Sequence, residues 1–483
     1  MKNNAEDFKA IALKVNEKLA AYISESQSAS GKVLVQKPAG ELAELLQLEK
    51  WVKQGGIAPD DISIFMDGYL DNTQHLHHPH YIGHQVCPPH VASGIADFIH
   101  GVVNNPMAIY EMGPAAAVIE KFLLNWMLDK IGWFMGKHWG DFTLYPGSGG
   151  GILTHGGSLA NLTALLAARA ATDPMAWQHG NSGKLMILAP EEAHYSIARS
   201  IAIMGIGANS VIAIPTNKNK VLLADTVPEI VKQQHQKGNT IMAVVANACA
   251  TATGLYDPLD EVGQYCNESG IWYHVDGAHG ASALLSAKYK YLLNGIHRAD
   301  SVIWDAHKLM RTSALAAAVL FKDHKTLDTI FQQKGSYLFH EKEVAGFDTM
   351  AYTVECTKAG IGTKLFWVLA AEGERGLASY LEKVYENTYK FYEIINKHPD
   401  FECPYKPESN ILCFRYTRNN PDNAFQLKLR NTLIQEGDFY ITSTELNGIR
   451  YLRIVVLNEL TTVEVIEKLL QKVTAIAEKL RYN

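Results

Sequence analysis

The sequence lacks an apolar run as long as the roughly 18 residues that a membrane-spanning helix requires. Its six cysteines are scattered through 483 residues without paired spacing, which predicts reduced thiols rather than a disulfide framework. Neither sign of charge dominates, because 44 Lys and Arg stand against 50 Asp and Glu, so no nucleic-acid or membrane footprint is visible. Residues 1–7 lack the apolar core of a secretory signal, so we expect a cytoplasmic protein with neither nucleic-acid nor membrane partners.

The chain is long and apolar enough to form sizeable hydrophobic cores. Its apolar content is 47%, and its length suits two or three domains. Short apolar runs bounded by Gly and Pro alternate with helical patterns, which indicates βα units and a mostly parallel sheet. These runs are residues 184–188, 211–214, 241–246, 271–275, 301–304 and 314–321. We predict an N-terminal helical segment over residues 1–103, a large α/β domain over 104–375 and a small α+β domain over 376–483. The small domain contains predicted strands at 410–416 and 450–456.

The most informative stretch is residues 271–310, where Asp276 follows one apolar strand and Lys308 follows the next. In an alternating sheet, ligands bind outside the carboxyl ends of the strands, so these two side chains can converge on one small molecule. Pyridoxal 5′-phosphate (PLP) needs such a pair. A lysine amine forms the Schiff base with its aldehyde, and a carboxylate keeps the ring nitrogen protonated so that the ring acts as an electron sink.

Two motifs in this stretch resemble the group II PLP-dependent amino acid decarboxylases. They are His-Val-Asp-Gly-Ala-His at 274–279 and Arg-Ala-Asp-Ser-Val-Ile-Trp-Asp-Ala-His-Lys-Leu at 298–309. The family includes aromatic amino acid, glutamate, cysteine sulfinate and diaminobutyrate decarboxylases, and the resemblance runs from about Pro79 to Trp367. It implies PLP fold type I, which is aspartate aminotransferase-like. It also implies a PLP-dependent carboxy-lyase of amino acid metabolism that releases CO2 and an amine through a Lys308 Schiff base.

A glycine-rich segment at residues 147–158 leads into a helical pattern that starts at Leu159. A glycine-permitted turn at a helix N-terminus directs backbone N–H groups and the positive end of the helix dipole toward an anion. A glycine run alone is equally compatible with an ordinary loop. The segment 154–161 is similar to the family's phosphate loop, which implies that Gly157 and Ser158 bind the phosphate. It lacks the Lys-Ser/Thr of a nucleotide P-loop.

The same resemblance assigns further cofactor contacts. It implies that His194 stacks on the pyridine ring opposite Ala278, that Thr251 reaches the cofactor or the substrate carboxylate, and that His307 orients the phosphate or the lysine. Plainer alternatives are a helix cap for His194, a strand-end turn for Thr251 and a packing role for His307. The predicted catalytic residues are Lys308, Asp276 and His194.

A metal centre is an alternative use of the histidines. Candidate ligands are His274, Asp276 and His279, and separately His75, His77, His78, His80 and His84. A zinc site needs side chains that converge, whereas His274 and Asp276 point the same way on a strand and His279 lies beyond it. We therefore predict no metal.

The histidine-rich loop more closely resembles the family's substrate-side segment. This resemblance implies that Tyr81 and His84 lie beside the substrate, together with Phe347 from a later loop. The arginine that commonly follows the proline in the family is His80 here. No arginine is clearly placed for a distal carboxylate, so the sequence does not identify which amino acid is the substrate.

The return of a proton to the α-carbon is where the chain departs from the family. The family's acid is commonly a tyrosine on a mobile loop, and the alignment puts Phe347 at that place and Lys358 where an arginine is usual. Tyr352, Tyr337, His194 or a water remain alternative donors. Decarboxylation with oxidative deamination by an aldehyde synthase, or an aminotransferase, therefore stays open beside the simple decarboxylase. A binding protein without activity or a metal hydrolase is the remaining alternative.

The resemblance also predicts the assembly. The family forms homodimers in which the N-terminal segment wraps the partner and loops of both subunits line each site. We therefore expect a homodimer with C2 symmetry, the commonest closed arrangement, and with shared active sites.

Overall fold

The computed structural model describes residues 4–332 and 346–482, and these fall into two compact units. Unit 1 comprises Met1–Pro88, Glu386–Lys406 and Asn410–Asn483, and unit 2 comprises Pro89–Tyr385 and Pro407–Ser409. Each unit is described by itself. The three-part division drawn from the sequence stays a prediction.

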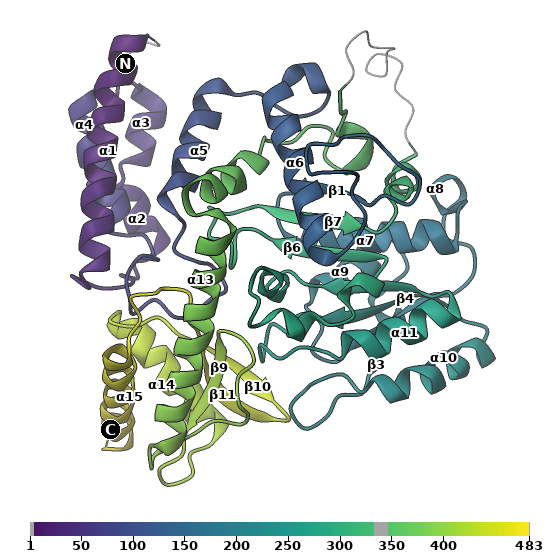
Figure 1. Cartoon of the computed structure of the whole chain (residues 1–483). Helices are drawn as coiled ribbons and strands as arrows, with labels where there is room; N and C mark the ends of the chain where they lie inside the picture. The colour runs from purple at the N-terminus through teal and green to yellow at the C-terminus, as the bar shows by residue number, and fades with distance from the viewer. Residues whose placement is uncertain (1–3, 333–345, 483) are drawn as a thin grey trace. The chain divides into compact units, whose positions relative to one another are not determined.

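Unit 2 contains a sheet in the order β1-β7-β6-β5-β4-β2-β3 (Figure 1). Its strands are β1 Gly150–Thr154, β2 Leu185–Pro190, β3 Val211–Ile214, β4 Thr240–Asn247, β5 Trp272–Asp276, β6 Ser301–Asp305 and β7 Ala317–Phe321. Strand β7 runs antiparallel to both neighbours and the other pairs are parallel. Every residue of β6 and β7 is buried, as expected for strands covered on both faces. The predicted mostly parallel α/β sheet is confirmed.

Helices surround this sheet. They are α5 Val91–Val103, α6 Pro114–Ile131, α7 Gly157–Thr172, α8 Ala176–His179, α9 Ser196–Ile203, α10 Val227–Gln236, α11 Leu259–Ser269 and α12 Leu327–Ile330, and α13 Gly362–Lys397 continues into unit 1. Short 3-10 turns are η1 Tyr110–Met112, η2 Ala208–Ser210, η3 Ala224–Thr226, η4 Gly280–Leu285, η5 Lys290–Leu293, η6 Ile296–Arg298, η7 His324–Thr326 and η8 Met350–Tyr352. Across the described residues, no helix has the length and apolarity needed to cross a membrane.

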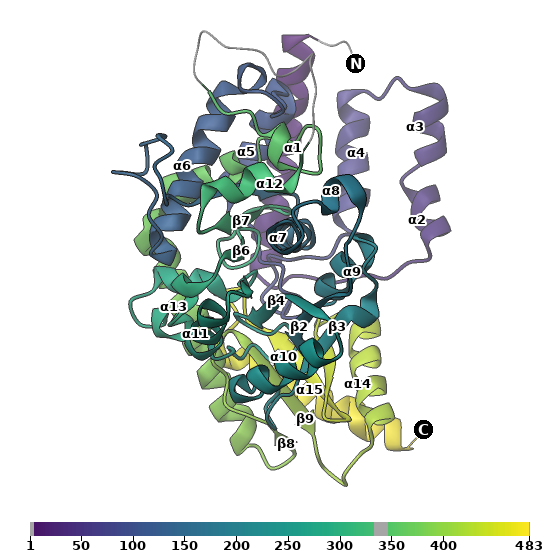
Figure 2. The same cartoon turned by 90° about the vertical axis from the view of Figure 1, so that its right-hand side faces the viewer.

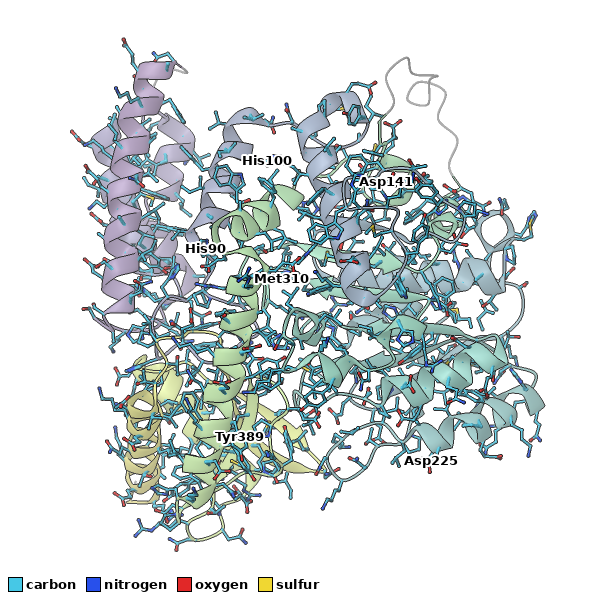
Figure 3. The ribbon with its side chains drawn as sticks, viewed as in Figure 1. His90, His100, Asp141, Asp225, Met310 and Tyr389 are labelled. Atoms are coloured by element: carbon cyan, nitrogen blue, oxygen red, sulfur yellow. The ribbon has the colours of Figure 1, made fainter. Side chains whose placement is uncertain are left out.

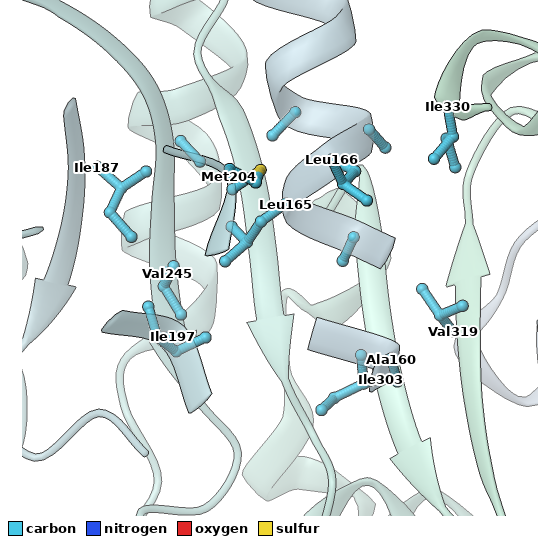
Figure 4. Close-up of a cluster of buried hydrophobic side chains, with 14 of the residues drawn as sticks. Ala160, Leu165, Leu166, Ile187, Ile197, Met204, Val245, Ile303, Val319 and Ile330 are labelled. Carbon is cyan, nitrogen blue, oxygen red and sulfur yellow. The ribbon is translucent and has the colours of Figure 1, made fainter. Parts of the chain in front are cut away.

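Helix α7 forms the centre of the unit 2 core. It contacts β1, β4, β5, β6 and β7, and four of its alanines, Ala160, Ala164, Ala167 and Ala168, are fully buried and let the helix approach the sheet closely. Leu165 of α7 packs in the same cluster as Val245 and Ile303 of the sheet (Figure 4). This packing fixes the N-terminus of α7 relative to the strand ends.

The glycine-rich segment contains a strand that the sequence interpretation missed. Residues 150–154 form β1, which pairs with β7. A Cβ at Gly150 would come within 2.9 Å of His324 Cα, and one at Gly151 within 2.7 Å of the Val319 carbonyl oxygen. The early glycines therefore allow close packing of β1, whereas Gly156, at φ +108°, makes the turn into α7.

Unit 1 combines N-terminal helices with a small antiparallel sheet in the order β10-β11-β9-β8. Its elements are α1 Ala5–Gln27, α2 Ala39–Leu45, α3 Leu48–Gln54, α4 Pro59–Leu70, β8 Phe401–Glu402, β9 Ile411–Tyr416, α14 Asn423–Glu436, β10 Thr442–Leu446, β11 Ile449–Val455 and α15 Val463–Tyr482. Helix α1 lies beside α4, where Lys18 pairs with Asp67 at 2.6 Å. Helices α14 and α15 pack together (Figure 2). The predicted N-terminal helices and C-terminal α+β structure are confirmed.

Candidate active site

Three neighbouring strands of unit 2 end in polar residues at one edge of the sheet. Asn247 ends β4, Asp276 ends β5 and Asp305 ends β6. Asn247 lies opposite Asp276 in the parallel register, and Asp276 lies opposite Ile303. Because the carboxyl ends of parallel strands meet at one edge, these side chains share one place. They line a cavity of about 290 Å³.

The structure brings all of the predicted cofactor contacts into this one cavity. These residues are Gly157, Ser158, His194, Thr251, Asp276, Ala278, His307 and Lys308. Lys308 lies on the turn after β6, and Met310, which follows two residues later and is labelled in Figure 3, is fully buried. The turn that carries the lysine is therefore anchored to the core of unit 2.

The Asp276 carboxylate is held by neutral donors. Asn161 Nδ2 donates to Asp276 Oδ2 at 3.0 Å, and the backbone N–H of Ala278 donates to Oδ1 at 3.2 Å. Asn161 lies one turn into α7, where it also donates to Ser196 Oγ at 2.9 Å. These contacts fix the orientation of the carboxylate without adding a positive charge that would compete for it.

A buried hydrogen-bond chain continues behind Asn161. Trp272 Nε1 donates to Ser301 Oγ at 2.9 Å, and this hydroxyl lies 2.9 Å from His274 Nδ1. His274 Nε2 lies 2.9 Å from Asn161 Oδ1, which can only accept. The proton of the neutral imidazole is therefore on Nε2. Burial lowers the pKa of His274 to about 4, which favours this neutral form.

His194 lies two residues before helix α9 and lines the cavity. Its Nδ1 is 2.8 Å from Ser196 Oγ and accepts from the Ser196 N–H at 3.3 Å. Burial lowers the pKa of His194, although the nearby Asp276 carboxylate opposes the shift. The neutral ring therefore accepts at Nδ1 and carries its proton on Nε2.

Lys308 and His307 both approach Asp305. Lys308 Nζ lies 3.3 Å from Asp305 Oδ2, and His307 Nε2 lies 3.7 Å from the same oxygen. His307 Nδ1 is 2.8 Å from the Ala316 carbonyl oxygen and 3.3 Å from the Ala316 backbone nitrogen. His307 is thereby fixed between the lysine turn and the start of β7.

The roles of the predicted substrate-side residues stay predictions. Tyr81 and His84 belong to unit 1, where Tyr81 is buried and stacks on Tyr440 with ring centroids 5.7 Å apart. His84 Nε2 is 2.9 Å from the Tyr440 hydroxyl. Burial raises the pKa of Tyr81 and lowers that of His84.

Phe347 lies in a second cavity of unit 2, of about 820 Å³, which Tyr352 also lines. Its ring packs edge-on against Tyr110 and Phe142. Tyr337, the other tyrosine considered as proton donor, lies outside the described residues. The structure therefore places Phe347 and Tyr352 in a neighbourhood other than that of Lys308.

Lys358, at the family's arginine place, lies in the core of unit 2. Its ammonium is 2.5 Å from both carboxylate oxygens of Glu120 and donates to the Leu153 carbonyl oxygen at 3.0 Å. The side chain is fully buried. Its observed contacts are therefore those of a structural ion pair next to β1.

Sequence reasoning missed Asp305, Asn161 and His155 at this cavity. Asp305 could have been found, because it ends an apolar strand as Asp276 does. Asn161 lies four residues after Gly157, one helical turn, which the helical pattern could have indicated. His155 pairs with Glu355 at 2.6 Å, and no sequence pattern links these two residues.

Comparisons with known proteins agree with this geometry. The family model described as pyridoxal-dependent decarboxylase conserved domain matches residues 68–417. The chain belongs to this family. It is a PLP-dependent amino acid decarboxylase, a carboxy-lyase of amino acid metabolism, and its resemblance to the group II enzymes is confirmed.

Individual relatives cover most of the chain. The acidic amino acid decarboxylase of Mus musculus is 28% identical over 390 residues, which are 80% of this chain and 68% of that protein. The L-2,4-diaminobutyrate decarboxylase of Acinetobacter baumannii is 25% identical over 450 residues, 89% of this chain and 86% of that protein. The crystal structure of mouse CSAD superimposes with a TM-score of 0.90 at 25% identity, covering 98% of this chain and 99% of that chain.

The residues of the cavity fit PLP. The aldehyde of PLP needs an amine, its ring nitrogen a carboxylate and its phosphate an anion site. This cavity contains all three, in Lys308, Asp276 and the start of α7. A Cβ at Gly157 would lie 2.8 Å from Asp305 Oδ2, so a larger residue would clash with that carboxylate at the start of α7. The donor set thus agrees with the cofactor of the family.

Proposed function

We propose that this enzyme removes the α-carboxylate of an L-amino acid and releases the amine, with Lys308 bonding covalently to the aldehyde of PLP. The observation that carries the proposal is that Lys308, Asp276 and the glycine turn before α7 line one cavity. A PLP-dependent decarboxylase needs these groups in one cavity. A protein that only binds a ligand does not require a lysine and a strand-end carboxylate in the same cavity.

Bound PLP supplies an electron sink for the electron pair left at the α-carbon when CO2 departs. Asp276 holds the proton at the ring nitrogen, since its two oxygens are already oriented by Asn161 and the Ala278 N–H. His274 hydrogen-bonds Asn161 and is neutral, so it adds no positive charge next to the Asp276 carboxylate.

The remaining cavity residues orient and enclose the reactants. We assign phosphate binding to the N–H groups of Gly157 and Ser158, because the first N–H groups of a helix have no acceptor within it. His194 and Ala278 bound the two faces of the ring, Thr251 contacts the cofactor or the substrate carboxylate, and His307 positions the lysine turn.

The proton returned to the α-carbon separates two outcomes. With a positioned acid the product is the amine, and without one an oxidative deamination to the aldehyde competes. Tyr337 and Tyr352 are the tyrosine candidates, with Phe347 the residue that the sequence alignment puts at the acid's place. Product analysis with and without oxygen distinguishes the two outcomes.

We propose that the enzyme is a homodimer. Helix α5 presents an apolar stripe to solvent at the spacing of one helical face, formed by Val91, Ile95, Phe98, Ile99 and Val102. Exposed apolar patches of this kind mark interaction sites. A second copy of the chain is the partner proposed to cover this patch, because the resembled family forms homodimers. The change Phe98→Glu should shift the mass measured by light scattering toward the monomer, whereas a monomeric wild type contradicts the proposal.

We further propose a cytoplasmic location, supported by the sequence features alone. Cell fractionation with an antibody against the chain tests it, and recovery from a membrane or secreted fraction would contradict it.

The function is tested by a substrate screen. Purified protein reconstituted with PLP is incubated with the twenty amino acids, diaminobutyrate and cysteine sulfinate, the last two because relatives carry those names. We expect CO2 and the matching amine from at least one amino acid, and neither from the Lys308→Ala control. A wild type that releases only aldehyde or keto acid contradicts simple decarboxylation.

A further inference from the structure

Asp305 is a buried carboxylate with an unusual surrounding. Its side chain is 2% exposed, and Oδ2 faces Lys308 Nζ at 3.3 Å. Oδ1 has no hydrogen-bond partner in the part of the chain that the structure describes. Leaving a buried acceptor without a donor is unfavourable, so a missing partner is expected to bind there.

The carboxylate lies against the first residue of α7. A Cβ on Gly157 would lie 2.8 Å from Asp305 Oδ2 and 3.0 Å from Oδ1. Helix α7 has 16 residues, and its N-terminus provides unpaired N–H groups and the positive end of the dipole. The unpartnered oxygen and the helix N-terminus therefore point independently to one ligand at this turn.

The ligand proposed at this turn is the phosphate of PLP. Its negative charge would lie beside the negative charge of the Asp305 carboxylate. Lys308 cannot both remain an ammonium paired with Asp305 and bond to the cofactor aldehyde, so cofactor binding removes the nearest described cation. Two anionic groups left side by side repel, whereas one proton held between them makes a strong O–H···O hydrogen bond.

We propose that Asp305 takes up one proton from solvent when the phosphate of PLP binds, and donates it in a hydrogen bond to the phosphate. In this step a solvent hydronium ion or buffer acid gives up the proton as its bond to hydrogen breaks, one O–H bond forms on the carboxylate, and no electron is transferred. The inference rests on the proposed function, because it takes the Gly157 turn as the phosphate site. It makes Asp305 a cofactor-binding residue whose effect is a pH dependence of cofactor affinity.

Other titratable groups face the same space and must be separated from Asp305. His307 lies 3.7 Å from Oδ2 on the same turn. His155, His194, His279 and Asp276 line the cavity from the neighbouring elements. A proton held by any of these groups would survive the removal of the Asp305 charge.

The test measures the number of protons that the protein takes up when PLP binds. It uses proteins that carry Lys308→Ala, so that no bond between Lys308 and the aldehyde contributes to the measurement. Apo Lys308→Ala and apo Lys308→Ala/Asp305→Asn are titrated with PLP by calorimetry near pH 8, in buffers of different ionisation enthalpy. We expect about one more proton taken up by the protein that retains Asp305. Its Kd for PLP should therefore rise about tenfold per pH unit relative to the Asn protein.

Two controls keep the result interpretable. Pyridoxal, which lacks the phosphate, should show no difference between the two proteins. Adding His307→Gln to Lys308→Ala should leave the proton uptake in place. Since pyridoxal and PLP can be compared in Lys308→Ala alone, the test does not depend on folding of the Asp305 variant.

Equal proton uptake with PLP in both proteins, or a difference that persists with pyridoxal, overturns the inference. Loss of the uptake with His307→Gln does the same, because it moves the proton to the imidazole. Tighter PLP binding to the Asn protein by the same factor at every pH means that Asp305 stays charged, which also contradicts it. Failure of wild type and Lys308→Ala to bind PLP instead contradicts the proposed function.

Discussion

Strands β5 and β6 end in aspartates at the same edge of one sheet, yet the two carboxylates have different neighbours. Asp276 receives hydrogen bonds on both oxygens, from Asn161 and from the Ala278 N–H. Asp305 has Lys308 on one oxygen and no described partner on the other. The position in the sheet decides where each carboxylate lies, and the neighbours decide which ligand group each can serve.

Removing the lysine has the largest expected effect on this comparison. Lys308→Arg keeps a cation near Asp305 but supplies no amine that can bond to an aldehyde, because guanidinium stays protonated. We expect the visible absorbance of the lysine-bound cofactor and the activity to be abolished while the fold, followed by circular dichroism, is retained. An arginine variant that keeps this absorbance would show that another residue holds the cofactor.

Exchanging each aspartate for asparagine tests the comparison itself. Asp276→Asn should reduce kcat by about 10²–10⁴-fold, the range typical of a lost proton-holding group, with PLP still bound. Asp305→Asn should instead change the pH dependence of PLP affinity, with a smaller loss of kcat. Steady-state kinetics and PLP titration of the pair decide, and a larger kcat loss in the Asp305 variant would reverse the assignments.

The proton donor lies outside the pair of aspartates and requires its own variants. Tyr337→Phe, Tyr352→Phe and Phe347→Tyr are compared by the ratio of amine to aldehyde. Loss of the true acid should reduce amine formation by up to about 10²–10⁴-fold. If Phe347 occupies the acid's place, Phe347→Tyr raises the ratio and neither phenylalanine variant abolishes the amine. If Tyr337→Phe or Tyr352→Phe abolishes amine formation and Phe347→Tyr changes nothing, the alignment of Phe347 with the acid is wrong.

The smallest expected effect concerns the support behind Asp276. Burial lowers the pKa of His274 to about 4, so below pH ~6.5 the unfolded chain binds a proton that the folded chain does not. This group therefore destabilises the fold as the pH falls from ~6.5 toward 4, by about 1.5 kcal/mol between pH ~6.5 and ~5. The stability advantage of wild type over His274→Gln should shrink by this amount in chemical denaturation.

Asp257 titrates in the same range with the opposite sign. Burial raises its pKa to about 6, so the folded chain binds the extra proton and acid favours folding between pH ~4 and 6. The wild-type curve alone is therefore not diagnostic. An advantage over His274→Gln that stays constant with pH would contradict the neutral, buried His274.

The sequence predicted the strands that are apolar and buried on both faces. Runs at 241–246 and 301–304 became β4 and β6 with shifts of one residue at their ends. It missed β1, whose glycines hide the strand pattern, and β10, whose Thr-Ser-Thr-Glu-Leu sequence is mostly polar and only partly buried. Periodicity detects burial, so it fails where packing is achieved by small residues or is incomplete.

The site residues were predictable where a polar side chain directly follows an apolar strand. Lys308 and Asp276 follow from that rule, and the family resemblance supplied His194, Thr251 and the phosphate turn. The chain from Ser301 through His274 and Asn161 to Asp276 was not predictable, because it joins three separate elements that meet only in the folded sheet.

The most direct test of the central claim is to identify the lysine that holds the cofactor. The wild-type enzyme loaded with PLP is reduced with borohydride and digested, and its peptides are mapped by mass spectrometry. The account predicts that the peptide containing Lys308 carries the reduced cofactor, and that two other buried lysines of unit 2, Lys358 and Lys364, remain unmodified. Reduced cofactor on one of those lysines, or on none, would contradict it.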